Sequence, residues 1–600
     1  MRNLFGLGFL LIFSTISYGQ LRLTPIAQSS KESKKKQMLT LPFWDDFSAS
    51  HDRPDTTLWL FGSTVYVNAT VGANPPTYKT ATFDGLNGLG KAYGISALIR
   101  DKTDSLISHP INMTEADQTS TFISFYWQAK GNGEAPDKED SIRLQLKSND
   151  TTALWQTFWV KAGDVDNFDF QQEIIPINDP IFFHDSLQFK FEAFGSLNGQ
   201  FDTWNIDYIY LNDGRGADDL NYNDRALSGS PSPLFGNYTQ IPFAHLAEGD
   251  SITFAAQSVL ATNLSDSRFN LIYRHLLTNE SLDIEYSNEL IPRGGIDALT
   301  GSYLFDTIFS PEIRIKSPSL ETVSDSQIIA STFIFFTEDE EPIIDITPGR
   351  NLEVNDTIKT AYLLHDQYAY DDGSAEFAAG INLNTGMLAV RYIINTRDTL
   401  NHIRIYFPDI APDANGSPID LIVWGKNLEK IRVRQPYTIS KLNAINEFTE
   451  IKLENPIIVS DTFHIGYEQF TDNFIGLGFD RNNPEASSSI FTNITGEWQQ
   501  NERLTGALMI RPVFKRDTTV ILSQKKNLEH LEFTIFPNPA KLKLYINGEY
   551  DHIEMLNLSG QLIYRSSNKR YHDLIGIKKG LFLVKIFRDN QFVIRKLIVE

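Results

Sequence analysis

Short stretches in which apolar and polar residues alternate recur along this 600-residue chain. Residues 141–147 (Ser-Ile-Arg-Leu-Gln-Leu-Lys) and 187–192 (Leu-Gln-Phe-Lys-Phe-Glu) alternate without a break. Because successive side chains of a β-strand point to opposite faces of a sheet, each stretch has one face to bury. The 3.6-residue period of an amphipathic helix is nearly absent. The pattern predicts an all-β protein.

Two further stretches, residues 122–127 and 155–160, are apolar nearly throughout. Such runs are typical of central strands that are buried on both faces. Aromatic residues make up 12% of the chain, which also favours sheets. A chain of this length is too long for one hydrophobic core, so about four domains are expected.

The charge and the cysteine count exclude several classes of function. The formal net charge is -22, which argues against a nucleic-acid-binding role because such proteins need a basic face. The chain has no cysteine, so disulfides, thiol nucleophiles, zinc–thiolate sites and iron–sulfur clusters are excluded.

The first 19 residues are typical of a signal peptide. Arg2 is followed by an apolar run at residues 4–13, and small residues precede a predicted cleavage between Gly19 and Gln20. The run is too short to span a bilayer, and no other apolar run approaches that length, so we expect no transmembrane segment in the mature chain. Residues 20–40 are a predicted polar linker.

Three large β-modules are expected next. Residues 41–215 and 350–516 are predicted to form jelly-roll sandwiches, and residues 220–345 an immunoglobulin-like sandwich of six or seven short strands. The strands predicted in the third module are residues 388–394, 403–407, 421–424, 451–453, 463–467 and 508–513. Residues 517–532 are a polar linker that a peptidase could cut.

The last segment, residues 533–600, alternates again, with Leu542, Leu544 and Ile546 predicted on one face. Evenly spaced short strands separated by turn residues predict a small β-sandwich. Pro537 and Pro539 cannot donate to a strand ladder, so they mark its entry edge.

This segment resembles the type A C-terminal sorting domain of the type IX secretion system. Two departures are Leu581, where a tyrosine is usual nearby, and a final Glu600 in place of lysine. The residues that carry the resemblance are Phe536, Pro537, Asn538, Pro539, Gly560, Gly580 and Lys596.

The resemblance implies export through a type IX translocon and contact with a sorting peptidase. It also implies a secreted protein or one attached to the outer-membrane surface, with lipopolysaccharide as a candidate anchor.

The first module resembles MAM and cleaved-adhesin jelly rolls, which are concanavalin-like sandwiches. The matching stretches include residues 43–47 (Phe-Trp-Asp-Asp-Phe), 82–85 and 202–209. The resemblance implies binding to a glycan or a protein, and the missing disulfides favour the bacterial adhesin-like version.

No strong catalytic motif is present, so no catalytic residue is predicted. Asp283 and Glu285 have the spacing of a carboxylate pair but lie in the immunoglobulin-like region, away from any expected groove. Trp498 lies in a predicted loop, residues 496–499, and is therefore the tryptophan best placed to contact a ligand.

Structural calcium is a candidate cofactor. Calcium prefers carboxylate and carbonyl oxygens, and Asp45-Asp46, Asp140, Asp207 and Asp371-Asp372 are candidate ligands. By the jelly-roll resemblance, Asp46 and Asp207 would lie at such a site, near the first and last strands. The alternative is that these residues only cap turns.

An Asp followed by Ser or Thr and then an aliphatic residue or Thr recurs more often than average usage predicts. The pattern resembles the O-glycosylation acceptor sequence of the same group of Gram-negative bacteria, although turn chemistry explains part of the excess. The predicted acceptors are Thr56, Ser105, Ser141, Thr151, Ser186, Ser251, Thr307, Thr357, Thr399 and Thr518.

These observations predict an exported, multi-domain, non-enzymatic β-protein that binds a glycan or protein. The alternatives are a secreted carbohydrate-active hydrolase and an inert structural spacer. The ligand prediction rests on fold analogy.

Overall fold

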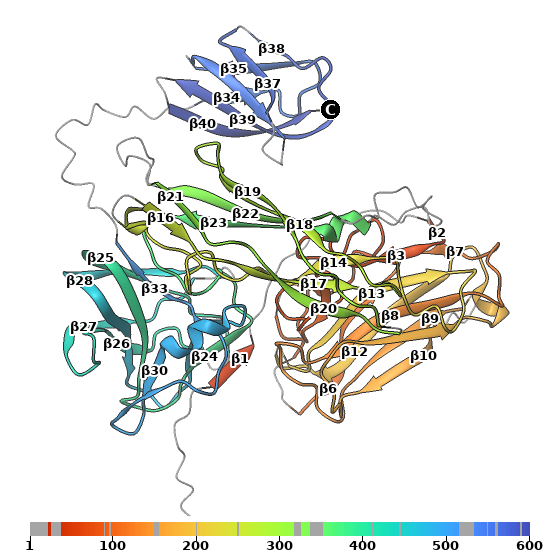
Figure 1. Cartoon of the computed structure of the whole chain (residues 1–600), viewed down its shortest axis with the longest axis horizontal. Helices are drawn as coiled ribbons and strands as arrows, with labels where there is room; N and C mark the ends of the chain where they lie inside the picture. Colours follow the sequence, from red (N-terminus) through yellow and green to blue (C-terminus); the bar gives the residue numbers. More distant parts are fainter. Residues whose placement is uncertain are drawn as a thin grey trace, which may run out of the picture. The chain divides into compact units, whose positions relative to one another are not determined.

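The computed structural model describes residues 22–25, 38–88, 91–94, 98–148, 155–199, 201–248, 251–299, 301–316, 326–336, 352–410, 413–442, 446–514, 533–548, 550–557, 562–569, 571–588 and 591–599. The chain divides into two compact units, Met1–Lys515 and Arg516–Glu600. Both are built almost entirely from antiparallel sheets (Figure 1), which confirms the all-β prediction. Within the described ranges, no helix is long and apolar enough to cross a membrane.

The first sandwich packs two sheets face to face. One sheet has the strand order β11-β8-β13-β5-β4, with β3 also paired to β13, and the other has the order β10-β9-β12-β6. Phe125 of β8 meets Phe191 of β12 edge to face, with ring centroids 4.8 Å apart. The strands are β3 (Phe43–Asp45), β4 (Tyr66–Asn68), β5 (Thr80–Phe83), β6 (Arg100–Ile107), β8 (Phe122–Ala129), β9 (Ser141–Lys147), β10 (Trp155–Ala162), β11 (Gln171–Pro176), β12 (Gln188–Ser196) and β13 (Trp204–Asn212), and β2 (Leu39–Thr40) pairs in parallel with β7 (Ile111–Asn112).

The two apolar runs of this module have different outcomes. Strand β8 lies between β11 and β13 and is buried along nearly its whole length, as predicted. The prediction for residues 155–160 was wrong, because β10 is an edge strand. Trp159 packs on Phe125 with ring centroids 5.1 Å apart, but Val160 is 58% exposed. Only one face of this strand meets the core.

The middle region places one four-stranded sheet, β19-β18-β22-β23, against two three-stranded sheets. Phe269, Leu271 and Tyr273 alternate with other residues in the sequence, and all three are buried. The three-stranded sheets are β14-β17-β20 and β15-β16-β21. The strands are β14 (Arg225–Ser228), β15 (Ala247–Glu248), β16 (Ser251–Phe254), β17 (Ser258–Asn263), β18 (Ile272–Asn279), β19 (Ile284–Pro292), β20 (Leu304–Phe309), β21 (Ile313–Lys316), β22 (Gln327–Phe336) and β23 (Thr357–Leu364).

The structure moves the boundary between the middle and third modules. Strand β23 pairs with β22 along its whole length, from Leu364 opposite Gln327 to Thr357 opposite Ile334. The sequence prediction had assigned these residues to the third module. The two strands are consecutive in the chain, but residues 337–356 separate them, so the local sequence pattern did not show that they pair.

The third sandwich pairs a four-stranded sheet, β1-β24-β29-β32, with a larger sheet of order β27-β26-β28-β25-β30-β31, in which β33 also pairs with β25. Strand β1 (Arg22–Pro25) comes from the segment predicted as a linker and pairs with β24. The other strands are β24 (Phe377–Ile381), β25 (Met387–Ile405), β26 (Pro418–Trp424), β27 (Ile431–Thr438), β28 (Thr449–Gln469), β29 (Ile475–Asp480), β30 (Ile490–Asn493), β31 (Trp498–Gln500), β32 (Ala507–Leu508) and β33 (Ile510–Val513).

Pairs of strands that were predicted separately are continuous here. Residues 388–394 and 403–405 belong to β25, and residues 451–453 and 463–467 belong to β28. The two long strands pair with each other, with register shifts between Ile394 and Asp398 and between Leu400 and His402. Polar residues at these irregularities interrupt the alternation, so a search for short strands splits each one.

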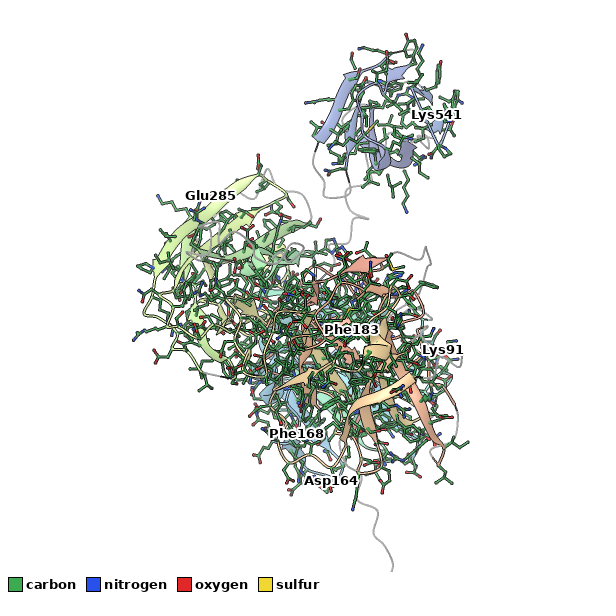
Figure 2. All side chains as sticks on the ribbon, turned by 90° about the vertical axis from the view of Figure 1, so that its right-hand side faces the viewer. Lys91, Asp164, Phe168, Phe183, Glu285 and Lys541 are labelled. Carbon is green, nitrogen blue, oxygen red and sulfur yellow. The ribbon has the colours of Figure 1, made fainter. Side chains whose placement is uncertain are left out.

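The C-terminal unit is a small sandwich of the sheets β34-β35-β38 and β37-β36-β39-β40. Leu544 is buried, but Leu542 precedes β35 and is 63% exposed, which corrects its predicted place in the core. Lys541 beside it is also exposed (Figure 2). The strands are β34 (Thr534–Phe536), β35 (Lys543–Asn547), β36 (His552–Leu556), β37 (Leu562–Ser567), β38 (His572–Asp573), β39 (Gly580–Arg588) and β40 (Gln591–Val599).

The predicted sorting residues meet at the last strand. Asn538 donates from its side-chain nitrogen to the carbonyl of Lys596 (2.7 Å) and accepts from the backbone N–H of Ile598 (2.9 Å). The Pro-Asn-Pro segment is therefore attached to β40. Gly580 begins β39, whereas Gly560 lies outside the described residues.

Candidate functional site

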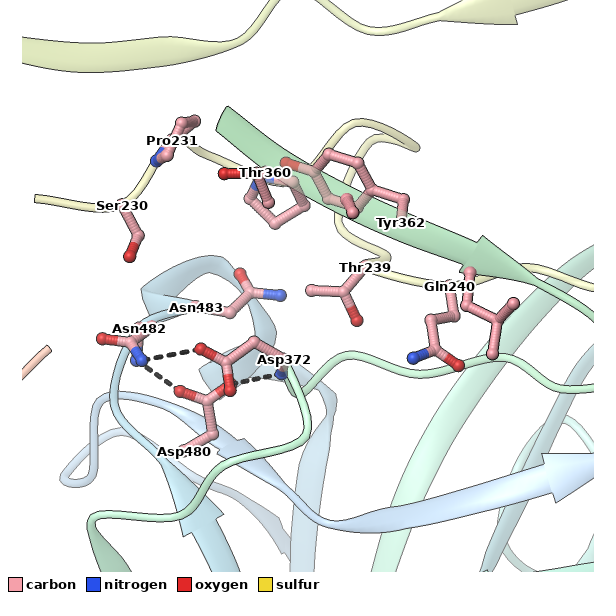
Figure 3. A pocket seen from close by; sticks show the side chains of 13 residues that line it. Ser230, Pro231, Thr239, Gln240, Thr360, Tyr362, Asp372, Asp480, Asn482 and Asn483 are labelled. Atoms are coloured by element: carbon pink, nitrogen blue, oxygen red, sulfur yellow. Dashed lines mark hydrogen bonds between the residues drawn. The ribbon is translucent and has the colours of Figure 1, made fainter. Parts of the chain in front are cut away.

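A cavity of about 110 Å³ lies between the middle and third sandwiches, and we call it the interdomain pocket. The middle sandwich contributes loop residues and strand β23, and the third contributes the loop before β24 together with the end of β29 and the residues that follow it (Figure 3). The lining residues are Ser230, Pro231, Pro233, Thr239, Gln240, Thr360, Ala361, Tyr362, Leu363, Asp372, Asp480, Asn482 and Asn483.

Strand pairing brings two carboxylates of the pocket together. Strands β24 and β29 are antiparallel, with Phe377 opposite Phe479. The start of β24 and the end of β29 therefore lie at the same edge of the sheet. Asp480 is the last residue of β29, and Asp372 lies in the loop that leads into β24.

Local hydrogen bonds hold both carboxylates in place. Asp480 accepts from the backbone N–H groups of Asp372 (2.7 Å) and Asn482 (2.6 Å). Asp372 accepts from the N–H (2.8 Å) and hydroxyl (2.6 Å) of Ser374 and from the side-chain nitrogen of Asn482 (2.9 Å). We call Asp372, Asp480, Asn482 and Asn483 the pocket cluster.

Asn483 is held by two carbonyls and has one unused acceptor. Its side-chain nitrogen donates to the carbonyls of Asn237 (2.8 Å) and Tyr370 (2.9 Å). Its side-chain oxygen, Oδ1, has no protein partner, although Asn483 is only 1% exposed. A buried acceptor without a partner costs about 1–3 kcal/mol, so this atom calls for an explanation.

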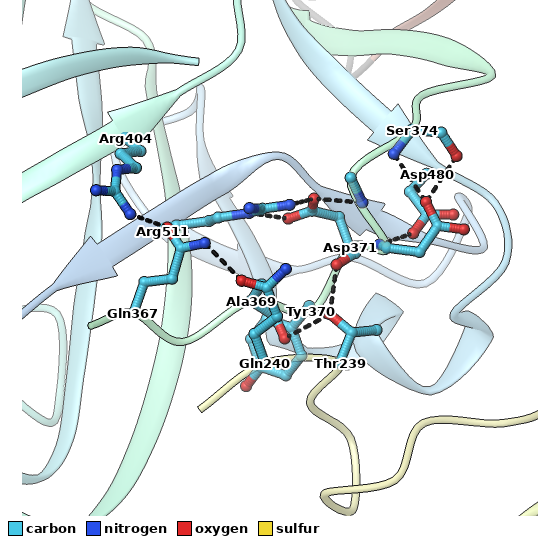
Figure 4. A network of polar contacts seen from close by, with 12 residues as sticks. Thr239, Gln240, Gln367, Ala369, Tyr370, Asp371, Ser374, Arg404, Asp480 and Arg511 are labelled. Atoms are coloured by element: carbon cyan, nitrogen blue, oxygen red, sulfur yellow. Dashed lines mark hydrogen bonds and ion pairs between the residues drawn. The ribbon is translucent and has the colours of Figure 1, made fainter. Parts of the chain in front are cut away.

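Asp371 differs from its neighbour Asp372. It is fully buried and forms an ion pair with the guanidinium of Arg511. On the other side of Arg511, Arg404 donates to Gln367 (2.7 Å), and Gln367 donates to Gln240 (2.6 Å) (Figure 4). This network ties the third sandwich to the loop of the middle sandwich that lines the pocket.

Burial and crowding of acidic groups change the acidity of this region. Burial raises the pKa of Asp480 well above its usual value, and the charges of Asp372 and Glu376 raise it further. Burial, followed by the charge of Asp372, raises the pKa of Glu376 to about 7. The carboxyl groups of this region thus oppose one another's ionisation.

The structure also brings together the predicted calcium ligands of the first sandwich. The hydroxyl of Thr77 lies 3.1 Å from the backbone carbonyl of Asp46 and 3.1 Å from the carboxylate of Asp207. Asn355 donates to the carboxylate of Asp46 (3.0 Å). We call Asp46, Thr77, Asp207 and Asn355 the Thr77 cluster.

Protein donors already engage the oxygens of this cluster. Asp46 accepts from the N–H (3.1 Å) and hydroxyl (2.7 Å) of Ser48, and Asp207 accepts from the N–H groups of Thr77 (3.0 Å) and Tyr208 (2.6 Å). Burial, and then the charge of Asp46, raises the pKa of Asp207 well above its usual value. Calcium at Asp46 and Asp207 stays a prediction.

Another acidic group in the first sandwich has ligand atoms close enough for a metal ion: Asp137, Asp140 and Asp202. Arg100 forms ion pairs with both Asp137 and Asp140. The guanidinium thus supplies positive charge to this cluster.

Other residues singled out in the sequence lie away from the pocket lining. Asp283, in the turn between β18 and β19, and Glu285, near the start of β19, are both exposed (Figure 2 labels Glu285). Trp498 lies in edge strand β31 and not in a loop, and it packs edge to face on Trp424 at 5.2 Å. Gly19 and Gln20 of the predicted signal cleavage lie outside the described residues.

The predicted glycosylation acceptors within the described ranges all have some exposure. Thr56, Ser186, Thr357 and Thr399 are exposed, and the rest are half-buried. Ser141, Ser251 and Thr357 are the first residues of their strands, which fits the turn-chemistry explanation. The half-buried acceptors are Ser105, Ser141, Ser251 and Thr307; Thr151 and Thr518 lie outside the described residues.

Sequence reasoning identified Asp371 and Asp372 as candidate cation ligands but missed Asp480, Asn482 and Asn483. Their signal was a run of polar residues, Asp-Arg-Asn-Asn, directly after an apolar strand. Runs of this kind are common at turns. Nothing in the sequence placed this turn beside residue 372.

Comparison with known proteins finds one family. Residues 534–600 match the family described as "Secretion system C-terminal sorting domain". This match agrees with the type IX resemblance and indicates export to the cell surface or the medium. Comparison with curated protein sequences finds no match.

Two of the solved structures that match are distant from this chain. The glycoside hydrolase domain of Endo-D from Streptococcus pneumoniae is 10% identical, with 54% of this chain and 43% of that chain covered and a TM-score of 0.20. β-Glucuronidase 2 from Bacteroides uniformis is 8% identical, with 60% and 34% covered and a TM-score of 0.20. The chain spans less than half the length of these structures, and TM-scores this low establish neither a shared fold nor a shared activity. Residues 534–600 are thus similar to a secretion sorting domain, and this similarity indicates that the protein is exported.

Proposed function

We propose that this protein is a non-catalytic binding protein of the cell surface or medium that holds a hydroxyl-rich ligand, such as a glycan, in the interdomain pocket. The observation that carries the proposal is the chemistry of the lining. Acceptors from Asp372, Asp480 and Asn483 face hydroxyl and amide groups from Ser230, Thr239 and Gln240 across one cavity. Hydroxyl groups of a sugar both donate and accept, so they fit such a surface.

The charge and size of the pocket limit which ligands it can hold. Asp372 and Asp480 disfavour an anionic ligand. Ligand pockets for drug-sized molecules occupy about 300–1,000 Å³, whereas this one occupies about 110 Å³. The pocket therefore suits one terminal sugar unit better than a long chain. The ring of Tyr362 supplies an apolar surface for such a unit.

A glycan array tests this proposal. The wild-type protein should bind a subset of neutral glycans and release no reducing sugar. Thr360→Val should weaken this binding, whereas Asp461→Asn, an exposed site of the third sandwich, should leave it unchanged. Failure of the wild-type protein to bind any glycan would support the inert-spacer alternative and reject the proposal.

The hydrolase alternative has one supporting observation. Burial raises the pKa of both Asp480 and its neighbour Asp372, and a carboxyl group with a raised pKa is what the general acid of glycoside cleavage requires. Steady release of reducing sugar by the wild-type protein, abolished in Asp480→Asn, would establish this alternative. Binding without release would exclude it for the glycans tested.

The finer parts of the export route are also proposals. A signal peptide cleaved between Gly19 and Gln20, a type IX translocon, a sorting peptidase and a lipopolysaccharide anchor are together supported by the match at residues 534–600. Cells that make the full chain should place it at the surface, and a version ending at Lys526 should stay inside. Equal surface delivery of both versions would contradict the sorting role.

Two proposals concern the surface modules. The first sandwich would be an adhesin-like module, with Asp46 and Asp207 around a structural calcium. A chelator should then lower its thermal stability, and an unchanged melting temperature would remove the calcium.

The exposed Asp-Ser/Thr sites would carry O-linked glycans in the native host. Intact-mass measurement should give a mass above that of the bare polypeptide. A mass equal to the polypeptide would exclude the modification.

A further inference from the structure

We propose that the interdomain pocket holds a calcium ion between the carboxylates of Asp372 and Asp480 and the side-chain oxygen of Asn483. All three residues lie on the same side of the pocket (Figure 3). The sites considered for calcium in the first sandwich are separate from this one.

The two carboxylates are fixed but not saturated. The segment from Asp480 to Asn482 positions both, since Asn482 donates its N–H to Asp480 and its side-chain nitrogen to Asp372. Each carboxylate oxygen has two lone pairs, so acceptor capacity remains on both groups. The geometry thus presents two preorganised oxygen ligands.

Asn483 gives the independent sign of a ligand. Its nitrogen is committed to the carbonyls of Asn237 and Tyr370, which fixes which end of the amide is the oxygen. That oxygen is buried, has no protein partner and belongs to a residue that lines the pocket. A cation beside it would satisfy this unused acceptor.

The charged groups around the pocket favour a cation, and not a hydrogen-bond donor of the protein, as the partner of these oxygens. Asp371 has its own counter-charge in Arg511, but no Lys or Arg is among the described residues that line the pocket. The pocket cluster therefore holds two neighbouring carboxyl groups, and none of the described lining residues places a basic side chain beside them. A divalent ion would balance the charge of the carboxylates that bind it.

The ligand set selects the type of ion. All three proposed ligands are oxygens, which calcium and magnesium prefer, whereas zinc prefers nitrogen and sulfur. Magnesium demands near-ideal octahedral geometry, and calcium accepts irregular shells of six to eight oxygens. Water would complete the shell. That a sugar hydroxyl replaces one of these waters rests on the proposed function; the ion site itself does not.

Calorimetric titration of the chelator-treated full chain with calcium chloride tests the inference. We expect a site with a dissociation constant of about 10⁻⁴–10⁻³ M, the range of extracellular modules. Asp372→Asn and Asp480→Asn should each weaken it more than about tenfold. Asp461→Asn removes the same charge from an exposed position of the third sandwich and should leave it intact. Calcium binding that is absent, or equal in all four proteins, would overturn the proposal.

A terbium titration covers the case in which a variant fails to fold. Terbium replaces calcium, and Tyr362 in the pocket lining should sensitise its emission. Calcium should displace the ion from the wild-type protein, and Tyr362→Phe should lower the emission while keeping the calorimetric calcium site. Emission unchanged in Tyr362→Phe would place the ion elsewhere and reject the site.

The same experiments separate this inference from the proposed function. Glycan binding that persists in chelator, without any calcium site, would reject the ion and keep the glycan. If the wild-type protein binds no glycan but has a calcium site that Asp480→Asn removes, the ion site is kept and the glycan proposal is rejected.

Discussion

The first and third sandwiches each contain an Asp-Asp pair next to aromatic residues, but the two pairs lie in different environments. In the first, Asp45 accepts from the indole of Trp59 (2.6 Å), and Asp46 accepts from Ser48 and Asn355. In the third, Asp371 is paired with Arg511, and Asp372 is exposed and lines the pocket. The first pair is enclosed by neutral donors, whereas the second divides into one ion-paired and one pocket-facing carboxylate.

This difference shows how residues of the same type acquire separate roles. A buried carboxylate is tolerated only when donors or a counter-charge compensate for the loss of water. Asp45, Asp46 and Asp371 have such compensation within the fold. Asp372 remains accessible and is therefore available to a ligand.

The largest effect on stability is expected from Arg511→Met, which removes the ion-pair partner of Asp371 in the third sandwich. The change leaves Asp371 buried without its counter-charge, which should cost about 3–5 kcal/mol of stability. Urea unfolding followed by tryptophan fluorescence measures the loss. Lys359→Met removes an exposed partner of Glu280 and should change stability by no more than about 1 kcal/mol. Equal effects of the two changes would mean that Asp371 is not an enclosed ion.

The second-largest effect is expected in how the stability of the protein depends on pH, and it tests whether Asp45 of the Asp45-Asp46 pair is enclosed. Burial raises the pKa of Asp45 to about 7, so the folded state holds this proton more tightly than the unfolded chain does. The stabilisation is present at acidic pH and is lost as the pH rises from about 4 to about 7, by at most ~1.4 kcal/mol per pH unit.

Asp45→Asn should remove this part of the pH dependence, because the amide cannot titrate. Unfolding midpoints of the variant and the wild type across that window measure it. Parallel curves for the two proteins would show that Asp45 is ionised in the fold and not enclosed as described.

A smaller effect is expected from Asn355→Ala in the Thr77 cluster. The change removes the donor that Asp46 receives from Asn355 and should cost about 1–3 kcal/mol. Thermal melting measures the loss. Ligand and calcium binding in the interdomain pocket should not change. Weaker binding there would show that the Thr77 cluster and the pocket cluster are coupled.

The smallest effect is expected in the C-terminal unit, where no such Asp-Asp pair occurs. Asn538→Ala removes two hydrogen bonds to β40 that are open to solvent, which should cost about 1 kcal/mol. Hydrogen exchange of β40 should speed up while that of the three sandwiches stays the same. Faster exchange throughout would argue against two independent units.

Local pattern was sufficient for much of the fold. The alternation in residues 141–147 and the apolar run at 122–127 correctly predicted a half-buried and a fully buried strand. The same kind of run failed at residues 155–160, because a strand at the edge of a sheet lacks the neighbour that would cover its second face. Register and position within a sheet depend on distant residues, which a local pattern does not contain.

The candidate site was harder to predict from the sequence than the fold. Asp371 and Asp372 drew attention as adjacent carboxylates, but their different roles depend on Arg511, 140 residues away. Asp480 joins Asp372 only because β24 and β29 pair in one register. Asp46 and Asp207 were predicted to lie together from the jelly-roll resemblance, and the structure brings them together around Thr77.

The sequence by itself determined that the chain is built of strands, that its last residues resemble a sorting domain and that cysteine chemistry is excluded. These properties follow from residue type and spacing over a few positions. The tertiary structure alone decided which carboxylates are enclosed, which are ion-paired and which face a cavity. Donors, counter-charges and the cavity wall come from strands and loops that are far apart in the chain and meet only when the sandwiches pack.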